Sequence, residues 1–406
     1  MKNCLICNSK IEPFISYGQM PIANGFLDKT QFEKEYFFHM QVAHCKECSM
    51  VQLIDTPDRE LMFNDNYAFF SGTSEAMKVH FRNFANEVKN NYLPEKDAFV
   101  VEIGSNDGIM LGNFKEWDIE HLGIEPSANV AAVAKGKGIN TVVEFFDENY
   151  AEKVIAEYGM ADAFIAANVM CHIPYFHSIV AGISKLIKKS GIVIFEEPYV
   201  GDVIEKTSYD QIYDEHTFLF SISSINYIFK EYGMEVVHAE HQDTHGGSMR
   251  YFIGHKGVRS VSDSALNQIR KEKELGLNNP DTYLKFKENC EKSKKELKAL
   301  LTELKNQGKK VAGYGATSKS TTILNYSEIG PDLIDYICDN TPIKQNKFSP
   351  GKHIPIVPIE HFKQNKPDYL VLFAYNHSKE IMAKENDFVE KGGKWILFVP
   401  NVHIVE

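Results

Sequence analysis

Four consecutive side chains that can exchange protons lie in one short stretch of the chain, QIYDEHTFLFS at residues 211–221. They are Tyr213, Asp214, Glu215 and His216, and apolar residues follow them closely. Histidine titrates near neutral pH and often accepts protons in catalysis, while tyrosine and carboxylates donate or accept hydrogen bonds beside it. The stretch therefore predicts general acid–base chemistry. A structural role, in which His216 is a satisfied donor and Tyr213 anchors a loop, fits the same residues equally well.

The cysteines near the N-terminus form two matched pairs, CLIC with Cys4 and Cys7 and CKEC with Cys45 and Cys48. Two thiolates spaced in this way bind one tetrahedral ion from a single turn, and two such turns close a four-cysteine zinc site. Unconnected reduced thiols would not account for matched pairs, and a redox role ordinarily needs only one pair. We predict a structural Zn²⁺ that takes no part in chemistry, because a closed site has no open coordination position.

A glycine-containing turn follows a buried-strand pattern in VVEIGSNDGIM, residues 100–110. Glu102, Gly104 and Gly108 allow a tight turn where the strand ends, and Glu125 ends the next strand, where an acid can reach ribose hydroxyls. The residues between the glycines are rich in acceptors and poorly suited to a pyrophosphate, which disfavours NAD. An acidic loop suits the positively charged S-adenosylmethionine. The alternative is an ordinary strand-to-helix turn, because a lone glycine motif is not specific.

These candidate residues need elements that bring them together, and the chain divides into four segments. Residues 1–76 contain the cysteine pairs. Residues 77–256 alternate apolar strand-length runs with helical stretches, which predicts a parallel, doubly wound sheet closed by an antiparallel pair. Residues 257–307 are charged and predict two solvated connecting helices, broken at GLNNPD. Residues 308–406 begin again with strand, glycine turn and helix, which predicts a second, smaller α/β unit.

The composition indicates an ordinary globular protein of two or three domains, with 406 residues, 43% hydrophobic and 24% charged. No apolar run approaches the roughly 20 residues of a membrane span, and the start MKNCLICNSK lacks the apolar core of a secretory signal. Seven cysteines, an odd number, fit a reducing cytoplasm. The net charge of −11 argues against nucleic acid as a partner, whereas a small anionic substrate needs only a few local cations.

Taken in order, the paired CxxC motifs, EIGSNDG, HIP, YDEHTFLFS, HGGSMR, GYGATSK and GKHIPI resemble the nucleotide-sugar C-methyltransferases of branched deoxysugar pathways. The resemblance covers essentially all 406 residues. It implies a zinc-binding N-terminal lobe, a central Rossmann-like domain that binds S-adenosylmethionine, and a Rossmann-like C-terminal domain that helps to hold the nucleotide sugar. The implied reaction places a methyl group on the sugar carbon beside a 4-keto group, usually C3.

By position, Tyr213, Glu215 and His216 fall on the active-site loop of that family, and His172 falls on its NVxxH segment. A carbon beside a ketone becomes nucleophilic only when its proton is removed to give an enolate, so a base and an oxyanion stabiliser are both needed. In this interpretation His216 is the base, and Tyr213 and His172 donate to the enolate oxygen. Glu215 is expected to fix the tautomer of His216 or to hydrogen-bond a sugar hydroxyl.

The same interpretation assigns residues to the two ligands. Those for S-adenosylmethionine are Tyr67, Glu102, Gly104, Ser105, Asn106, Gly108, Glu125, Pro126, Phe146 and Asn168. Those for the nucleotide-diphosphate sugar are His245, Arg250, Lys319, Lys344 and Lys352. Arg250 would pair either with a phosphate or with a carboxylate of the protein. The aromatic walls of a dry pocket are expected from four residues that also fit plain core packing, Phe69, Phe70, Phe145 and Phe146.

Two positions depart from the family pattern. Phe69 stands where the family tends to show a second tyrosine, two residues after Tyr67, so a hydroxyl contact to cofactor or substrate would be missing. Ser320 and Thr321 stand where the family tends to have Gly-Asn after the lysine. The second departure leaves the nucleotide and its phosphate contacts open.

Three other functions fit part of the sequence. An O- or N-methyltransferase would use its base on a heteroatom and would need no ketone. A zinc-ribbon RNA-modifying methyltransferase is disfavoured by the acidic balance and by the lack of a basic, aromatic-interleaved stripe. A non-catalytic nucleotide-sugar-binding protein would bind both ligands without releasing S-adenosylhomocysteine. The patterns do not encode the sugar or its nucleotide; we expect a monomer or weak oligomer with no nucleic-acid or membrane partner.

Overall fold

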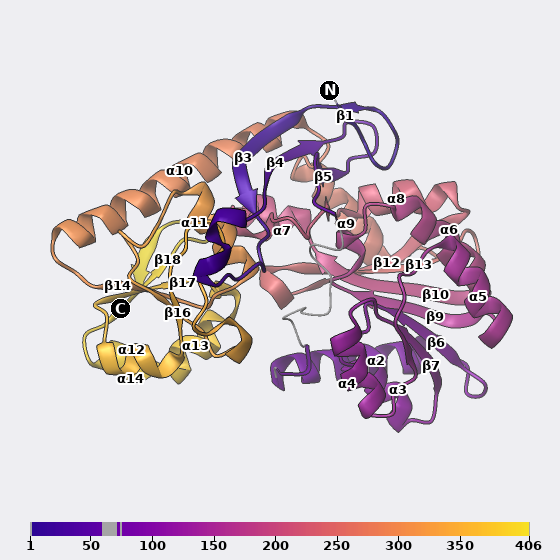
Figure 1. Cartoon of the computed structure of the whole chain (residues 1–406). Helices are drawn as coiled ribbons and strands as arrows, with labels where there is room; N and C mark the ends of the chain where they lie inside the picture. Colours follow the sequence, from indigo (N-terminus) through magenta and orange to yellow (C-terminus); the bar gives the residue numbers. More distant parts are fainter. Residues whose placement is uncertain (1, 59–70, 74, 406) are drawn as a thin grey trace.

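The structure of the chain is a computed structural model that describes residues 2–405 apart from 59–70 and 74. The positions outside the described residues include three named above, Tyr67, Phe69 and Phe70. The described strands form three main sheets and one two-stranded ribbon. Figure 1 shows the sheet of the N-terminal lobe at the top, the largest sheet at the right and the C-terminal sheet at the left. The class is α/β, as predicted.

The N-terminal lobe, called the zinc lobe below, consists of short antiparallel strands around the two cysteine turns. Its strands are β1 (Lys2–Asn3), β2 (Lys10–Ile11), β3 (Pro13–Pro21), β4 (Phe37–His44) and β5 (Val51–Leu53). One cysteine turn joins β1 to β2 and the other joins β4 to β5. The main sheet has the order β11-β5-β4-β3, and its strand β11 (Phe218–Leu219) comes from the distant stretch 211–221. A strand of two residues has no periodicity, so this pairing was not predicted.

The central sheet has seven strands in the order β12-β13-β10-β9-β6-β7-β8. They are β6 (Phe99–Ile103), β7 (Glu120–Ile124), β8 (Thr141–Val142), β9 (Ala161–Ala167), β10 (Ile187–Pro198), β12 (Met234–Gln242) and β13 (Ser248–His255). Only β13 runs antiparallel to its neighbours, so the predicted closing pair of β12 and β13 is confirmed. All five residues of β6 are buried, as expected for a strand covered on both faces.

Helices cover both faces of the central sheet. They are α2 (Glu75–Tyr92), α3 (Leu111–Glu116), α4 (Ala128–Gly136), α5 (Glu148–Tyr158), α6 (Phe176–Leu186), α7 (Val200–Lys206) and α8 (Ile222–Glu231). In Figure 1, α2, α3 and α4 lie below the sheet, α6 and α8 lie above it, and α5 lies at its right-hand end. Alternate residues of β6 enter two different cores, Val100 with α2 and α3, and Val101 with α5 and α6. Because successive side chains of a strand point to opposite faces, β6 contributes to the apolar cores on both sides of the sheet.

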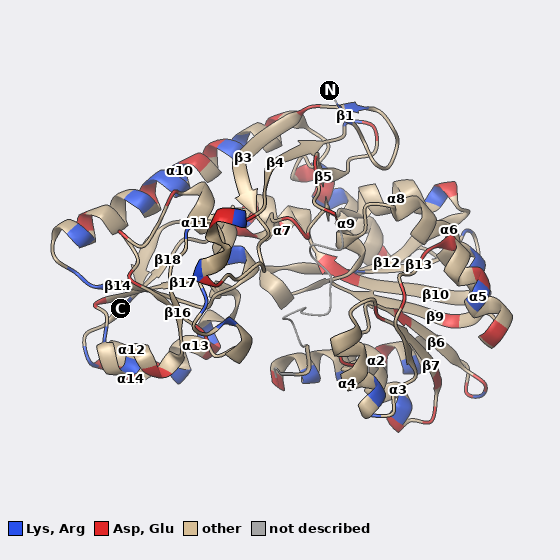
Figure 2. Cartoon of the chain, viewed as in Figure 1, with Lys and Arg blue, Asp and Glu red and all other residues tan. Residues whose placement is uncertain are grey.

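Two further helices follow the central sheet, α9 (Asp263–Glu274) and α10 (Pro280–Asn306), and the predicted break between them is confirmed. Asn279 caps α10 by accepting from the backbone of Asp281, with Pro280 at the first turn. The helix is more than a solvated connector, because Tyr283 packs against Phe14 of the zinc lobe at 5.1 Å between ring centroids. Figure 2 shows Lys and Arg interspersed with Asp and Glu along the outer side of α10.

The C-terminal unit has a six-stranded sheet in the order β16-β15-β14-β17-β18-β19. The strands are β14 (Val311–Tyr314), β15 (Ile337–Cys338), β16 (Ile356–Val357), β17 (Tyr369–Leu372), β18 (Lys394–Leu397) and β19 (His403–Val405). The helices with it are α11 (Ser318–Tyr326), α12 (Ile359–Asn365), α13 (Ser378–Lys384) and α14 (Asn386–Glu390). All pairs are parallel except β18 with β19, which makes the unit Rossmann-like.

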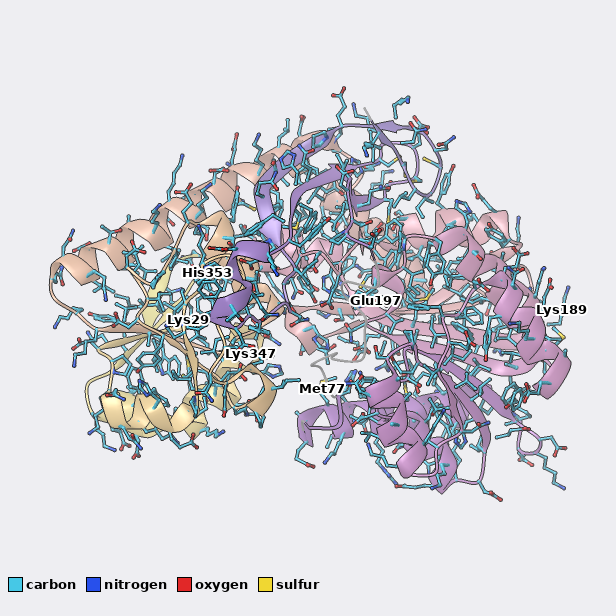
Figure 3. All side chains as sticks on the ribbon, in the orientation of Figure 1. Lys29, Met77, Lys189, Glu197, Lys347 and His353 are labelled. Carbon is cyan, nitrogen blue, oxygen red and sulfur yellow. The ribbon has the colours of Figure 1, made fainter. Side chains whose placement is uncertain are left out.

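The zinc lobe also contacts the C-terminal unit through the 3₁₀ helix η1 (Lys29–Lys34) and its flanks. Glu35 accepts from His353 at 2.7 Å, and the ring of Phe32 stacks on the same imidazole at 3.7 Å. Figure 3 shows Lys29 and His353 at this contact. Among the described residues, no helix is both long and apolar enough to cross a lipid bilayer.

Candidate active site and zinc site

A cavity of about 380 Å³ lies where the zinc lobe, the central sheet and the C-terminal unit meet. Its walls include Asn24 of the zinc lobe, the ends of β6 and β7 at Gly104 and Glu125, and Lys319 and Lys344 of the C-terminal unit. Both Rossmann-like sheets therefore contribute the edges at which such sheets bind ligands, the carboxyl ends of their parallel strands.

The stretch 211–221 brings Tyr213 and His216 into direct contact inside this cavity. The Tyr213 hydroxyl lies 2.7 Å from Nε2 of His216, and Nδ1 of His216 lies 2.6 Å from the carbonyl oxygen of Gln211. A carbonyl only accepts, so Nδ1 carries the proton and donates to it. Burial, with a smaller contribution from His172, lowers the pKa of His216 well below its usual range. The ring is therefore neutral, and its Nε2 lone pair accepts from Tyr213.

His172 lies beside His216, with the two rings stacked at 5.3 Å between centroids. Burial lowers the pKa of His172 to about 4, so this imidazole is also neutral. It belongs to the 3₁₀ helix η3 (Met170–His172), which Glu197 holds by accepting from the backbone N–H groups of Val169 and Met170 at 2.9 and 2.7 Å. Sequence reasoning missed Glu197, although a carboxylate at the end of the buried strand pattern GIVIFEEP was a signal for a buried role.

Glu215 lines the cavity but does not fix the tautomer of His216, because the Gln211 carbonyl does so. Its Oε1 accepts from the side-chain amide of Asn24 at 2.6 Å. Burial raises the pKa of Glu215 to about 7, against the lowering effects of Asn24 and of the charge of Lys344. Neighbouring Asp214 does not line the cavity; it accepts from the backbone N–H of Ala23 in the zinc lobe at 2.9 Å. Of the two roles expected for Glu215, the hydrogen bond to a substrate hydroxyl is the one that its position leaves available.

The residues predicted to bind S-adenosylmethionine divide by position. Those that line the cavity are Gly104, Asn106, Glu125, Pro126, Phe146 and Asn168. Three that lie in the strand and turn behind the cavity wall are Glu102, Ser105 and Gly108. Glu125 is held rigidly, because its two carboxylate oxygens accept from the backbone of Asn106 and Ser127 at 3.0 and 2.8 Å. This places an acid at the end of β7, where a ribose would lie.

The glycine turn is tight for a steric reason. Gly104 has φ +59°, and a Cβ there would lie 2.2 Å from a methyl carbon of Val169. Asp107 of this turn does not line the cavity and pairs with Lys137 at 3.2 Å. The turn therefore presents less negative charge to the cavity than its composition predicted. Phe145 and Phe146 both line the cavity, as does Met77 of α2, which Figure 3 labels beside it. The cofactor side of the cavity is thus largely apolar and aromatic.

Two half-buried lysines of the C-terminal unit reach the opposite side of the cavity. Lys319 donates to the carbonyl of His245 at 3.1 Å, and Lys344 donates to the carbonyl of Ala316 at 2.8 Å. Burial lowers the pKa of both ammonium groups. His245 also lines the cavity, whereas Lys352 does not.

The two residues that depart from the family pattern do not line the cavity either. Ser320 completes a capping box with Thr317 at the start of α11. Thr321 donates to the carbonyl of Ala23 at 2.9 Å. Both side chains therefore hold the protein together rather than contact a nucleotide.

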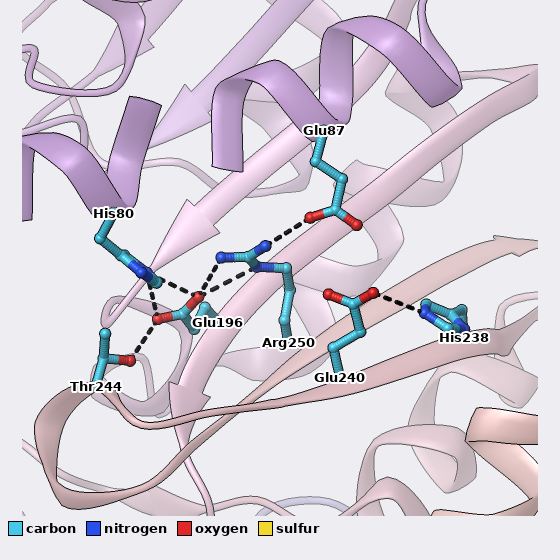
Figure 4. A network of polar contacts seen from close by, with 7 residues as sticks. All are labelled: His80, Glu87, Glu196, His238, Glu240, Thr244 and Arg250. Atoms are coloured by element: carbon cyan, nitrogen blue, oxygen red, sulfur yellow. Dashed lines mark hydrogen bonds and ion pairs between the residues drawn. The ribbon is translucent and has the colours of Figure 1, made fainter. Parts of the chain in front are cut away.

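Arg250 does not line the cavity and pairs with carboxylates of the protein (Figure 4). Its guanidinium contacts Glu196 at 2.8 Å and Glu87 at 2.6 Å, above the ring of Phe84. Burial alone would raise the pKa of Glu196. The hydrogen bond and charge of His80 and the charge of Arg250 have a larger effect, and they lower this pKa to about 2. Arg250 therefore pairs with carboxylates of the protein, which was one of the two predicted alternatives. The other alternative, a contact with a phosphate of the substrate, is not supported.

The four cysteines of the zinc lobe converge, with all four sulfur atoms within 4.8 Å of one another. Two of the separations are 3.6 Å, for Cys4 with Cys48, and 3.3 Å, for Cys7 with Cys45. Zinc bound tetrahedrally at about 2.3 Å from each sulfur requires separations of about 3.8 Å, so the donor set fits the ion. The two turns have the same shape, since the residue after each pair, Asn8 or Ser49, has φ 59°.

Three consecutive parts of the chain match known sequence families. Residues 4–63 match a zinc binding domain, residues 78–239 a methyltransferase domain, and residues 243–400 a C-methyltransferase C-terminal domain. The C-methyltransferase NovU of Streptomyces niveus is 29% identical over 393 residues, which cover 96% of this chain and 93% of NovU.

Solved structures with a similar region include the magnesium protoporphyrin IX methyltransferase ChlM of Synechocystis with bound S-adenosylmethionine. It is 12% identical with a TM-score of 0.32, and the match covers 44% of this chain and 77% of ChlM. The PH0226 protein of Pyrococcus horikoshii is 12% identical with a TM-score of 0.36, and the match covers 50% of this chain and 100% of PH0226.

We expect one tightly held zinc ion per chain. Because structural zinc sites contribute about 10 to 16 kcal/mol of apparent binding free energy, Cys45→Ser should lose most of the metal and lower the melting temperature. Elemental analysis and calorimetry measure the two effects. Cys290→Ser, which changes a buried thiol outside the cluster, is the control and should retain the zinc. Purified protein without metal, or a Cys45→Ser protein with its full metal content, would contradict the assignment.

Gly104→Ala should weaken binding of S-adenosylhomocysteine about tenfold or more, because it adds left-handed backbone strain and a clash with Val169. Gly136→Ala is the matched control, since a Cβ there meets no atom within 4 Å. Titration calorimetry on both variants and on the unmodified protein checks the difference. Equal affinities would show that the turn at Gly104 does not hold the cofactor.

Proposed function

We propose that the chain uses S-adenosylmethionine to methylate the carbon beside the 4-keto group, taken as C3, of a nucleotide-linked deoxysugar; the matches to a methyltransferase domain, to a C-methyltransferase C-terminal domain and to NovU support this. The observation that carries this proposal is the hydrogen-bonded pair of Tyr213 and His216, which lines the same cavity as the cofactor-side Glu125 and two half-buried lysines. One cavity thus offers a base, an acid for a ribose and cations for a diphosphate. These groups match the three parts that the reaction must bring together.

We assign the proton transfer to His216. The substrate displaces the Tyr213 hydroxyl from Nε2, and the freed lone pair takes the C3 proton while the C–H electron pair forms the enolate. The imidazolium that results still donates from Nδ1 to the Gln211 carbonyl, which stabilises its charge. A base positioned in this way is worth about 10²- to 10⁴-fold in rate.

The enolate oxygen needs donors in a site without water. Tyr213, once released from His216, and the stacked His172 both line the cavity close to the base. We assign them to the developing oxyanion, where loss of one donor typically costs about 10²- to 10³-fold. Glu215 then accepts from a hydroxyl of the sugar.

On the cofactor side, Glu125 would accept from ribose hydroxyls, and the turn at Gly104 would allow close approach of the backbone. When bound, S-adenosylmethionine supplies the methyl group from a cationic sulfonium. Charge is lost as an anionic carbon meets that cation, so a dry site favours the step. Phe145 and Phe146 exclude water from this side of the cavity.

The diphosphate would lie against the N-terminal turn of α11, where Thr317 and Ser318 line the cavity. Lys319 follows them, and Lys344 reaches the same space from the 3₁₀ helix η6 (Pro342–Lys344), which follows β15. Desolvation lowers the pKa of both ammonium groups, and an anionic ligand beside them would raise it again and stabilise their charged form. We place the reaction in the cytoplasm, where cysteines stay reduced and can bind zinc rather than form disulfides.

Proton removal should be separable from methyl transfer. With S-adenosylhomocysteine in place and a nucleotide-linked 4-keto-6-deoxy sugar in D₂O, NMR should show exchange of the C3 proton without methylation. His216→Ala should lose both exchange and methylation, because it removes the base. Tyr213→Phe should retain part of each, because it removes one donor and leaves the base in place.

Wild-type exchange in His216→Ala would make that histidine structural and move the base to His172, Glu215 or Tyr213. Locating the methyl group of the product by NMR tests the reaction class. A methyl group on oxygen or nitrogen would overturn the assignment to carbon.

A further inference from the structure

Asn24 brings the zinc lobe into the active site. It lies in the turn after β3, lines the cavity and donates from its side-chain amide to Oε1 of Glu215 at 2.6 Å. This donor comes from a position 191 residues away in the chain. A neutral amide that contacts a buried carboxylate orients it and favours its ionised form.

The backbone beside Asn24 is held from two other parts of the molecule. The N–H of Ala23 donates to Oδ1 of Asp214 at 2.9 Å, and the carbonyl of Ala23 accepts from Thr321 of α11 at 2.9 Å. Ala23 is fully buried between these partners. The side chain of Asn24 therefore has a defined place relative to both Glu215 and the C-terminal unit.

A second connection joins the zinc site to the same segment. Leu5, between the first two cysteines, donates its N–H to the side-chain oxygen of Gln52 in β5 at 3.0 Å. Gln52 is buried and pairs with Phe218 of β11, and the N–H of Leu53 donates to the carbonyl of Thr217 at 2.8 Å. The zinc lobe and the stretch 211–221 thus contribute strands to the same sheet.

We infer that Asn24 is a positioning residue of the active site, by which the zinc lobe holds the carboxylate of Glu215 for contact with the substrate. The inference rests on the proposed function, in which Glu215 accepts from a sugar hydroxyl. Three ionisable groups face Glu215 besides its amide partner: Asp214 of the same loop, Cys171 of η3 and Lys344 of the C-terminal unit. Of the groups that face it, Asn24 and Lys344 favour the ionised carboxylate.

The pH dependence gives a readout that a purely structural role would not change. Burial already raises the pKa of Glu215 to about 7, and Asn24 opposes that rise. Removing the amide should raise the pKa further. Activity that needs the ionised carboxylate is lost as pH falls through that pKa, so the acidic limb of the kcat profile should move to higher pH.

The experiment compares Asn24→Ala, Asn24→Ser, Glu215→Gln and the double variant Asn24→Ala with Glu215→Gln, each in the zinc-loaded full chain. With the nucleotide-linked 4-keto-6-deoxy sugar, Asn24→Ala should lower kcat about 10- to 100-fold, the usual effect of losing a hydrogen bond to a charged group. The acidic limb should shift upward while zinc content stays unchanged. When Glu215→Gln is already present, adding Asn24→Ala should lower kcat by less than about a further twofold. Ser16→Ala, on the exposed surface of β3, is the control and should match the unmodified enzyme.

Three results would overturn the inference. The first is a double variant whose loss in kcat equals the product of the losses in the two single variants, since the two residues would then act separately. The second is an unchanged pH profile. The third is loss of zinc or of folding in both Asn24 variants, which would make Asn24 a structural residue of the lobe. An unmodified enzyme that neither exchanges nor methylates the sugar would instead refute the proposed function.

Discussion

The pairing of β11 with β5 is the contact on which the arrangement of the candidate active site depends. Residues 211–217 contain only short turns, so neighbouring elements must hold their backbone. The zinc lobe pairs with the strand at the end of this segment, and α11 holds its beginning, where Thr322 donates to the carbonyl of Ile212 at 2.8 Å. The apolar side chains of the lobe belong to the same core as those of the central sheet, and a bound metal would add to the stability of the lobe. Zinc bound by the four cysteines would thus support the stretch 211–221 only through the sheet that contains β5 and β11.

The cavity collects ionisable groups whose burial is unfavourable in itself. His172 and His216 lose hydration, and their pKa values fall, which leaves two neutral imidazoles ready to accept or donate a proton. Lys319 and Lys344 are half-buried with carbonyl partners, and an anionic ligand would stabilise their charges. Such groups lower the stability of the folded chain. In return, electrostatic interactions with a substrate are stronger there than in water.

Sequence reasoning found the features that depend on local spacing and missed those that depend on distant contacts. The cysteine pairs, the glycine turn and the run at 213–216 are each visible within a dozen residues. Asn24, the Gln211 carbonyl and Glu197 were missed, because each acts on a partner that no spacing rule connects to it. Arg250 has an obvious chemistry for phosphate, but only the fold shows that Glu196 and Glu87 already occupy it.

By itself the sequence determined the α/β class, the order of the sheets, the zinc ligands and the identity of the catalytic candidates, because periodicity and short motifs are written in neighbouring residues. Only the tertiary structure decided which candidates share the cavity and which partner each one takes. Glu102 and Lys352, expected to bind the cofactor and the substrate, lie outside its walls, while Thr321, one of the two departures from the family pattern, donates to Ala23 from 298 positions away. The protonation states of His172 and His216 also depend on the tertiary structure, because these side chains lose their hydration only when the chain folds.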